Sequence, residues 1–271
     1  MSIVFNFRIF LQDKIFSDYF CIKIGMGTLS FSKKRITIFE VLDETFFYAK
    51  KNWAFHVFFS LIYLSVYFSV TFYFAYRYGV IEEISSLMKN IEPISVLIER
   101  VALLGTQENI KTFSLIVFAL QAFLFPLHVG LFKIYKKTDL KETIGPSDLF
   151  SGYSGVNFFI FVSYFILWKF MMDLSFLFFP LAFLWILFTL LATPLMFFKN
   201  LSSFRAISLS FKATIRHIFL LFLAFILSLF FRYAGFLLFV FGLFTYPVII
   251  TTIYVLYKKI FEETSYPESQ T

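Results

Sequence analysis

Charged residues are scarce in this sequence and make up only 15% of its 271 residues. A soluble domain carries about 25% charged residues, whereas here hydrophobic residues reach 59% and the mean hydropathy is +0.81. Cysteine is scarce too, since Cys21 is the only one, which excludes an internal disulfide and a cysteine-based zinc cluster. The shortage of charge excludes a soluble globular domain and indicates a chain that folds in a lipid bilayer.

Motifs of common enzyme chemistry are missing as well. The sequence contains no Walker loop and no G-x-S-x-G, H-E-x-x-H or G-x-G-x-x-G motif. Its three histidines, His56, His128 and His217, do not have the spacing of metal ligands. We therefore expect no enzyme activity, no metal ion and no cofactor.

Apolar runs fill most of the chain, and a helix of about 20 residues is enough to cross a bilayer. These runs predict six spans, at residues 53–76, 112–132, 157–172, 174–198, 218–232 and 234–257. The last four spans form two hairpins that turn near Asp173 and near residues 232–235. The longer connection from Arg77 to Lys111 keeps helical spacing around Pro93, which predicts two short helices on the outer surface. The predicted fold is an all-α polytopic bundle of six transmembrane helices, arranged as three hairpins.

An amphipathic helix is predicted directly before the third hairpin. Its apolar stripe consists of Phe204, Ile207, Phe211 and Ile215. Its basic face carries Arg205, Lys212 and Arg216. In one interpretation, the apolar stripe enters the acyl chains and the basic residues contact lipid head groups. In the other, the helix packs on its own bundle and the basic side chains stay solvated. The span begins at Ile218 without a linker, which favours lipid contact.

The same unit recurs in the chain. Thr37 and Glu40 form a T-x-x-E capping box that starts a helix before the first span. Aligned with the helix before the third hairpin, it pairs Phe39 with Phe204, Leu42 with Ile207, Thr45 with Ser210, Phe46 with Phe211 and Lys51 with Arg216. A more divergent copy, in which Ser147 can cap a short helix, covers residues 146–157. We therefore expect an amphipathic interfacial helix before each hairpin.

Each returning helix also contains a proline, at Pro126, Pro194 and Pro247. Proline frees a backbone carbonyl and bends a helix. The sequence thus predicts three kinked return helices around a common axis.

Polar residues within the spans are candidates for a functional site. Gln121 and His128 in the second span, with Asn157 at the start of the third, can line a small polar site that faces the bundle. Lys169 and Asp173 are four residues apart at the end of a hairpin, which predicts a clamp on the turn. A proton relay is the alternative, and their position at the hairpin end argues against it.

The orientation follows from the positive charges. All but six of the 24 Lys and Arg residues fall in segments 1–53, 133–156, 199–217 and 258–271. The positive-inside rule predicts that these segments and both termini are cytoplasmic. Residues 1–35 and 258–271 are then cytoplasmic tails. The pattern becomes orderly only after Met26, so residues 1–25 are either a membrane-surface tail or sequence upstream of the true start.

Three stretches carry a family resemblance. They are DLFSGY (Asp148 to Tyr153), Pro194 ahead of a basic helix with Ala206 and Ser210, and the ending from GLFTYP to TIYVLYKK (Gly242 to Lys259). Together they resemble uncharacterised bacterial six-span inner-membrane proteins of the YciC type, which are similar to the membrane domain of membrane-anchored glycerophosphodiester phosphodiesterases. The resemblance covers roughly residues 37–261. It implies a bacterial inner membrane and a six-span topology rather than the hydrolase activity.

Three functions remain open: an envelope-organising or lipid-associating protein, a small permease, and a membrane subunit of a larger complex. The net charge of +7 lies in short segments between apolar runs. This arrangement favours anionic membrane lipids as partners, with other membrane proteins as further candidates, and argues against nucleic acid. The few charges within the spans argue against an ion-coupled permease. Lipid association without catalysis is the favoured function.

Overall fold

The computed structural model describes residues 36–89, 94–176, 178–237 and 240–262, and the predicted tail before residue 36 lies outside these ranges. Within them the chain forms helices and no strand. Six helical segments of the described residues are long and apolar enough to cross a membrane, at Trp53–Arg77, Glu108–Leu140, Val156–Ser175, Phe179–Lys199, Ile218–Gly235 and Phe241–Glu262. The predicted all-α fold with six spans is therefore confirmed, and the chain is an integral membrane protein.

The first hairpin is the longest, because two surface helices cap its far end. In chain order its elements are α3 (Ile38–Lys51), α4 (Trp53–Arg77), α5 (Val80–Lys89), α6 (Ile94–Leu104), α7 (Glu108–Leu124) and α8 (Pro126–Leu140). Helix α3 begins at the predicted capping box, where Thr37 Oγ1 accepts a hydrogen bond from the backbone N–H of Glu40 at 3.3 Å. Pro93 lies outside the described residues, between α5 and α6.

The second and third hairpins are more compact. The second consists of the 3-10 helix η1 (Pro146–Tyr153), α9 (Val156–Ser175), α10 (Phe179–Thr189) and α11 (Ala192–Lys199). The third consists of α12 (Ser203–Arg216), α13 (Ile218–Leu237), α14 (Val240–Thr245), α15 (Val248–Tyr257) and a final π-helical turn, η2 (Lys258–Glu262). The interfacial element of the second hairpin is thus a 3-10 helix, and its N-cap is Gly145 rather than Ser147.

Both compact hairpins turn later than the sequence pattern predicts. Helix α9 continues past Asp173 to Ser175, and α13 continues past Arg232 to Leu237. In the first case Lys169 pairs with Asp173 along the helix, so a charge does not end it. In the second, the Arg232 guanidinium lies 4.0 Å from the ring centroid of Tyr246. This aromatic contact accommodates the cation within the helix.

The return helix of every hairpin is broken close to its proline. Pro126 starts α8 and Pro247 precedes α15, whereas Pro194 lies in the first turn of α11. The segments after these breaks, α8, α11 and α15, contact one another pairwise. Their aromatic side chains meet at the shared axis, where the Tyr254 ring centroid lies 5.4 Å from that of Tyr135 and 5.9 Å from that of Phe198.

The three interfacial elements close a ring around this axis. Element η1 packs on α8, α12 packs on α10 and α11, and α3 packs on α15. Each interfacial element therefore contacts the return helix of the preceding hairpin, and the first contacts the last. This cyclic order of contacts is an approximate three-fold repeat.

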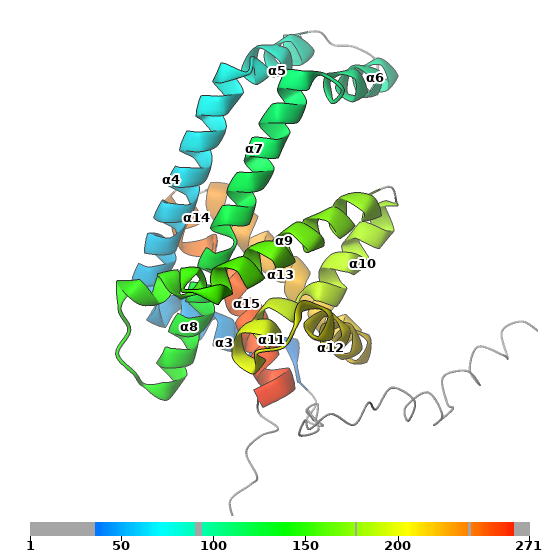
Figure 1. Ribbon diagram of the computed structural model, residues 1–271. Helices are drawn as coiled ribbons and strands as arrows, with labels where there is room; N and C mark the ends of the chain where they lie inside the picture. The colour runs from blue at the N-terminus through cyan, green and yellow to red at the C-terminus, as the bar shows by residue number, and fades with distance from the viewer. Residues whose placement is uncertain (1–35, 90–93, 177, 238–239, 263–271) are drawn as a thin grey trace, which may run out of the picture.

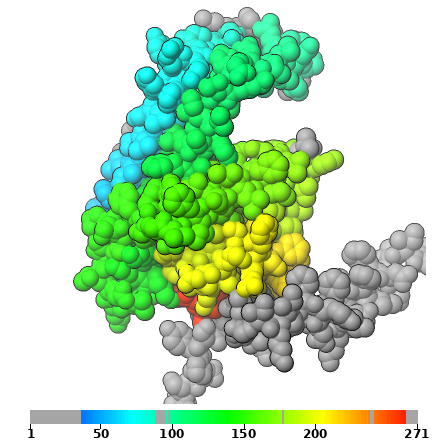
Figure 2. Space-filling model, in the orientation of Figure 1, coloured from blue at the N-terminus to red at the C-terminus, as the bar shows by residue number. Residues whose placement is uncertain are grey.

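One arm departs from the ring. Helices α4 and α7 run side by side away from the other spans, and α5 and α6 join them at the far end (Figure 1). Figure 2 shows the surface hollowed between this arm and the hairpin of α9 and α10. A cavity of about 680 Å³ lies between α7 and α9, lined by Gln121, Lys169 and Asp173 among others.

Candidate functional site

Helix α12 presents three different faces. Its buried face consists of small residues: Ala206, Ser210, Ala213 and Thr214. Its apolar residues Phe204, Phe211 and Ile215 are exposed instead, and Ile207 is half-buried. Arg205, Lys212 and Arg216 are exposed as well. The helix therefore packs on its own bundle through small side chains and leaves both its apolar and its basic residues on the outside.

Two hydroxyls fix α12 against the break between α10 and α11. Ser210 Oγ accepts a hydrogen bond from the backbone N–H of Leu191 at 3.1 Å. Thr214 Oγ1 donates to the carbonyl oxygen of Leu187 at 3.0 Å. Both backbone groups lie where the helical ladder is interrupted before Pro194, so α12 satisfies polar groups that lipid would leave unpaired.

Helix α3 repeats the exposure pattern of α12 residue by residue. Phe39 is 74% exposed and its counterpart Phe204 is 75% exposed, whereas Phe46 and Phe211 are 41% and 40% exposed. Thr45, the counterpart of Ser210, is likewise buried. The predicted repeat thus extends to the way in which the two helices sit on the ring.

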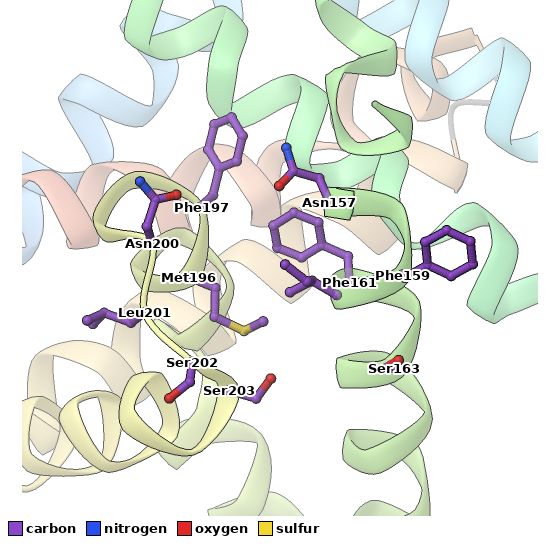
Figure 3. A pocket seen from close by; sticks show the side chains of 11 residues that line it. Asn157, Phe159, Phe161, Ser163, Met196, Phe197, Asn200, Leu201, Ser202 and Ser203 are labelled. Atoms are coloured by element: carbon purple, nitrogen blue, oxygen red, sulfur yellow. The ribbon is translucent and has the colours of Figure 1, made fainter. Parts of the chain in front are cut away.

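A cavity of about 700 Å³ opens beside the start of α12. Figure 3 shows Asn157 of α9 and Asn200 after α11 toward one end, and Ser202 and Ser203 of α12 toward the other. Phe161 and Met196 form part of its apolar wall. The cavity combines an apolar lining with a few polar groups, as is typical of binding sites for small molecules or lipid head groups.

The structure separates the three polar residues proposed for an intramembrane site. Gln121 lines cavities on the arm side of the bundle, and His128 contacts Tyr63 there with ring centroids 5.5 Å apart. His128 Nδ1–H donates to the carbonyl oxygen of Phe125 at 2.9 Å. Asn157 instead lines the cavity beside α12. Gln121 and His128 thus lie near a shared tyrosine, and Asn157 belongs to a different cavity.

Lys169 and Asp173 form an ion pair within α9. The Asp173 side chain is 57% exposed, and both residues line the 680 Å³ cavity that faces the arm. Their i,i+4 geometry fits the predicted clamp on the hairpin end.

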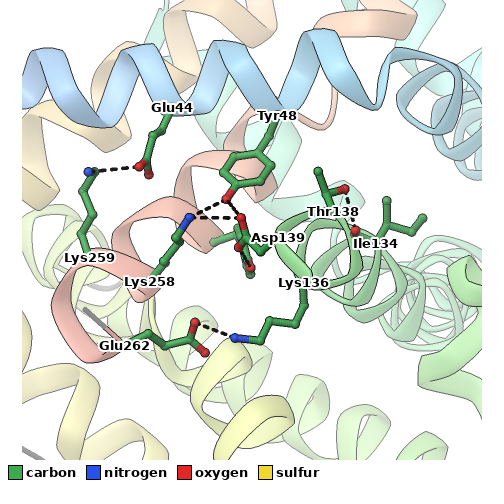
Figure 4. A network of polar contacts seen from close by, with 10 residues as sticks. Glu44, Tyr48, Ile134, Lys136, Thr138, Asp139, Lys258, Lys259 and Glu262 are labelled. Atoms are coloured by element: carbon green, nitrogen blue, oxygen red, sulfur yellow. Dashed lines mark hydrogen bonds and ion pairs between the residues drawn. The ribbon is translucent and has the colours of Figure 1, made fainter. Parts of the chain in front are cut away.

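A polar network at the end of the bundle opposite α5 and α6 was not predicted from the sequence (Figure 4). The Asp139 carboxylate of α8 accepts hydrogen bonds from the hydroxyls of Tyr48 and Tyr254 and pairs with Lys258 at 3.1 Å. Burial, followed by the neighbouring Asp139 carboxylate, raises the pKa of Tyr48 well above its usual range. Tyr48 therefore stays a neutral donor, and the network joins the first hairpin to the third.

Two further ion pairs tie the same elements together. Lys259 pairs with Glu44 of α3 at 3.4 Å, and Lys136 of α8 pairs with Glu262 at 2.8 Å (Figure 4). The lysines and glutamates of these pairs belong to segments for which the charge pattern predicted only a cytoplasmic location. Since they connect positions far apart in the sequence, a periodicity argument could not have paired them.

The DLFSGY stretch is held by a separate cluster. The Asp148 carboxylate lies 2.9 Å from the amines of both Lys133 and Lys137 and accepts from the backbone N–H of Gly145 at 3.0 Å. Burial alone would raise the pKa of Asp148, but the Gly145 N–H and the two lysines outweigh it and lower the pKa to about 2. Gly130 and Gly152 allow η1 to approach α8 closely.

Comparisons of the chain with models of protein families, with curated proteins and with solved structures give no match. The resemblance to YciC-type proteins stays a prediction. Among the described residues no group of three or more His, Cys, Asp or Glu side chains is placed to hold a metal ion.

Proposed function

We propose that this protein associates with anionic lipid at the membrane surface through its interfacial helices and organises the membrane around it without catalysing a reaction. The observation that carries the proposal is the matched exposure of α3 and α12. Each helix buries one face on the ring and leaves phenylalanines exposed at the same two positions; the buried residues are Val41, Thr45, Tyr48 and Ala49 on α3 and Ala206, Ser210, Ala213 and Thr214 on α12. An apolar face beside a basic one is the arrangement of a helix lying in the membrane interface.

The charges of α12 supply the preference for anionic lipid. Arg205, Lys212 and Arg216 are exposed on the helix that also exposes Phe204 and Phe211. A Lys or Arg near an anionic surface contributes about 1 kcal/mol of attraction. Three such residues would contribute about 3 kcal/mol, or roughly a hundredfold in affinity, relative to a neutral surface.

The cavity beside α12 offers polar partners for a head group. Asn157, Asn200, Ser202 and Ser203 line it, and the Arg205 that follows them is exposed. A lipid held by α12 could place its phosphate among these amides and hydroxyls while its chains remain outside. This use of Asn157 takes the place of the intramembrane polar site suggested by the sequence.

A small permease is the less favoured function. The segments α8, α11 and α15 meet at the axis through Tyr135, Phe198 and Tyr254. Close-packed aromatic rings leave a solute no route along this axis unless the helices move apart. A role as a subunit of a larger membrane complex stays compatible with the exposed apolar surface of the arm.

Location and orientation are part of the same proposal. The lysines and arginines gather in the segments around α3, η1, α12 and η2, and by the positive-inside rule this supports a cytoplasmic position for these segments. We place the protein in a bacterial inner membrane, where anionic phospholipid would face α12, and both termini in the cytoplasm.

The test compares lipid retention by two full-length variants that lose the same charge. One carries Arg205→Gln, Lys212→Gln and Arg216→Gln on α12. The control carries Arg77→Gln and Arg100→Gln on the arm and Lys141→Gln after α8, all exposed residues outside α12. After purification in low salt from mixed vesicles of dioleoylphosphatidylglycerol and dioleoylphosphatidylcholine, bound lipid is counted by native mass spectrometry. We expect the α12 variant to lose phosphatidylglycerol and to keep phosphatidylcholine, and the control to keep both. Equal retention of phosphatidylglycerol by the two variants would refute the proposal.

A further inference from the structure

Arg232 is a charged residue in the candidate membrane span Ile218–Gly235, three residues before its end, and it lines a cavity together with Tyr63 from the middle of α4. It lies 14 residues beyond Ile218, the first residue of α13, which corresponds to about 21 Å of helical rise in a hydrocarbon core of about 30 Å. A guanidinium at such a position is costly unless it is paired, and intramembrane charges of this kind commonly mark binding sites.

The partners of Arg232 within the protein are aromatic rather than acidic. Its guanidinium lies over the ring of Tyr246, and the two side chains also form a hydrogen bond. None of the ion pairs between described residues involves Arg232. A tyrosine ring attracts a cation but does not neutralise it, so the positive charge of Arg232 is available to an anion.

A cavity of about 320 Å³ adjoins this guanidinium, at the small end of the range typical of ligand sites. It is lined by Tyr63, Leu64, Tyr67, Phe68, Gln121, Arg232, Tyr233 and Tyr246. The lining includes no carboxylate. Instead it combines one cation with tyrosine hydroxyls and a glutamine amide, all of which can donate hydrogen bonds to an anion.

The rim of the cavity is open to the bilayer. Phe68 of α4 and Tyr233 of α13 line it and are 45% and 64% exposed. Both rings belong to candidate spans, so lipid acyl chains surround them. A ligand that arrives from this side has to be amphiphilic, with an anionic group for Arg232 and an apolar part that remains among the lipids.

The acidic residue of the adjacent cavity is already engaged. Asp173 lines the adjacent 680 Å³ cavity, which shares Tyr67 and Gln121 with the Arg232 cavity. Its carboxylate pairs with Lys169 on the same helix. Lys111 and Lys169 also line the adjacent cavity, so its two lysines and one aspartate add a net positive charge to the hollow in front of the arm.

We propose that the cavity between α4, α7 and α13 binds the anionic head group, a phosphate or a carboxylate, of a membrane amphiphile, with Arg232 as its counter-ion and Tyr246 and Gln121 as hydrogen-bond donors. The amphiphile enters laterally past Phe68 and Tyr233, and its chain stays in the bilayer. This site lies on the arm side of the bundle and does not depend on lipid contact at α12.

The test measures ligand binding by full-length Arg232→Gln, with Arg77→Gln as the matched control. Arg77 is an exposed arginine at the end of α4, so the control loses the same charge outside the cavity. The probes are dioleoylphosphatidylglycerol, oleate, uncharged dioleoylphosphatidylcholine and inorganic phosphate, each titrated in detergent and followed by native mass spectrometry and thermal stability. Arg232→Gln removes a half-buried charge that has no acidic partner among the described residues and should fold at least as well as the native protein, which its circular dichroism would show.

We expect one high-affinity equivalent of phosphatidylglycerol or oleate in the native protein and in Arg77→Gln, and at least tenfold weaker binding in Arg232→Gln. Arg232→Lys, which keeps the charge but loses the planar fork, should give an intermediate affinity. The α12 triple variant should keep this equivalent, so the two lipid sites can fail independently. Unchanged binding in Arg232→Gln, equal loss in Arg77→Gln, or binding of inorganic phosphate as tight as that of the lipids would overturn the proposal.

Discussion

Replacing Asp148 by asparagine tests how the DLFSGY stretch is held. The Asp148 side chain is only 6% exposed and contacts two lysines of α8 and the backbone N–H of Gly145. Asparagine has nearly the same shape and keeps one acceptor oxygen for Gly145, but it removes the negative charge. Any loss of stability in Asp148→Asn therefore reports the interaction of this carboxylate with Lys133 and Lys137.

The magnitude follows from the pKa of this group. The pKa of Asp148 is lowered from 3.8 to about 2, and a change of one pKa unit corresponds to 1.36 kcal/mol. The ionised carboxylate thus stabilises the folded state by about 2 kcal/mol at neutral pH. Because the folded pKa is the lower one, this contribution is present above pH 4 and is lost as the pH falls from about 4 to about 2.

The assay is reversible unfolding in mixed detergent micelles, followed by tryptophan fluorescence at pH 7 and between pH 4 and 2. We expect Asp148→Asn to lower the free energy of unfolding by about 2 kcal/mol at pH 7. The difference between native protein and variant should vanish near pH 2. Asp173→Asn is the control. The Asp173 side chain is 57% exposed, so its ion pair with Lys169 should contribute only about 0.2–1 kcal/mol to stability. A stability difference that is no larger than that of the control, or that persists at pH 2, would refute the reasoning.

Two further predictions concern packing and topology. Gly130→Ala and Gly152→Ala would each place a Cβ within 2.2 Å of a backbone oxygen, so we expect each variant to lose at least about 1–3 kcal/mol of stability in the same assay. Gly145→Ala should be almost neutral, because its Cβ would have its nearest neighbour at 3.6 Å. Equal effects at all three positions would contradict the close approach of η1 to α8. In a background without Cys21, a membrane-impermeant thiol reagent added to intact cells should modify Ser95→Cys on α6 and spare Glu142→Cys after α8, and the reverse labelling would invert the proposed orientation.

Hydropathy and helical periodicity were sufficient to predict most of the fold. Apolar runs located the six spans because a helix needs about 20 consecutive, mainly apolar residues to cross a bilayer. Lipid offers no hydrogen-bond partners, so every spanning segment has to meet this requirement. The capping box at Thr37 located the start of α3 because both of its residues are local in sequence. Spacing alone also identified which residues of α12 would be exposed with Phe204 and Arg205.

Hairpin ends were less predictable from charge. The turn predicted near residues 232–235 lies a few residues later, after Leu237, and the ring of Tyr246 contacts Arg232 where the sequence pattern placed the turn. Tyr246 belongs to the following helical segment, so its contribution depends on the tertiary structure. The predicted grouping of Asn157 with Gln121 rested on polarity, which does not reveal the direction in which a side chain points around a bundle.

The polar network around Asp139 could not be predicted from the sequence for a related reason. Tyr48 and Lys258 are separated by 210 residues and meet only because the ring closes. Each residue has a sufficient local explanation: Tyr48 as an interfacial aromatic and Lys258 as a positive charge after a span. Only the tertiary structure shows that Asp139 joins them.

The ring also accounts for the difference between η1 and the other two interfacial elements. Gly130 and Gly152 bring η1 into backbone contact with α8, and Leu149 between them is fully buried. A short 3-10 helix fits this narrow space. Helices α3 and α12 each run for 14 residues, bury one face and leave the opposite face exposed. Two of the three units therefore present an exposed pair of phenylalanines, and only α12 also places three basic residues beside it. If lipid association is the function, its strength should depend mainly on α12, because α3 carries Glu40 and Asp43 near Phe39 and anionic head groups repel these acids.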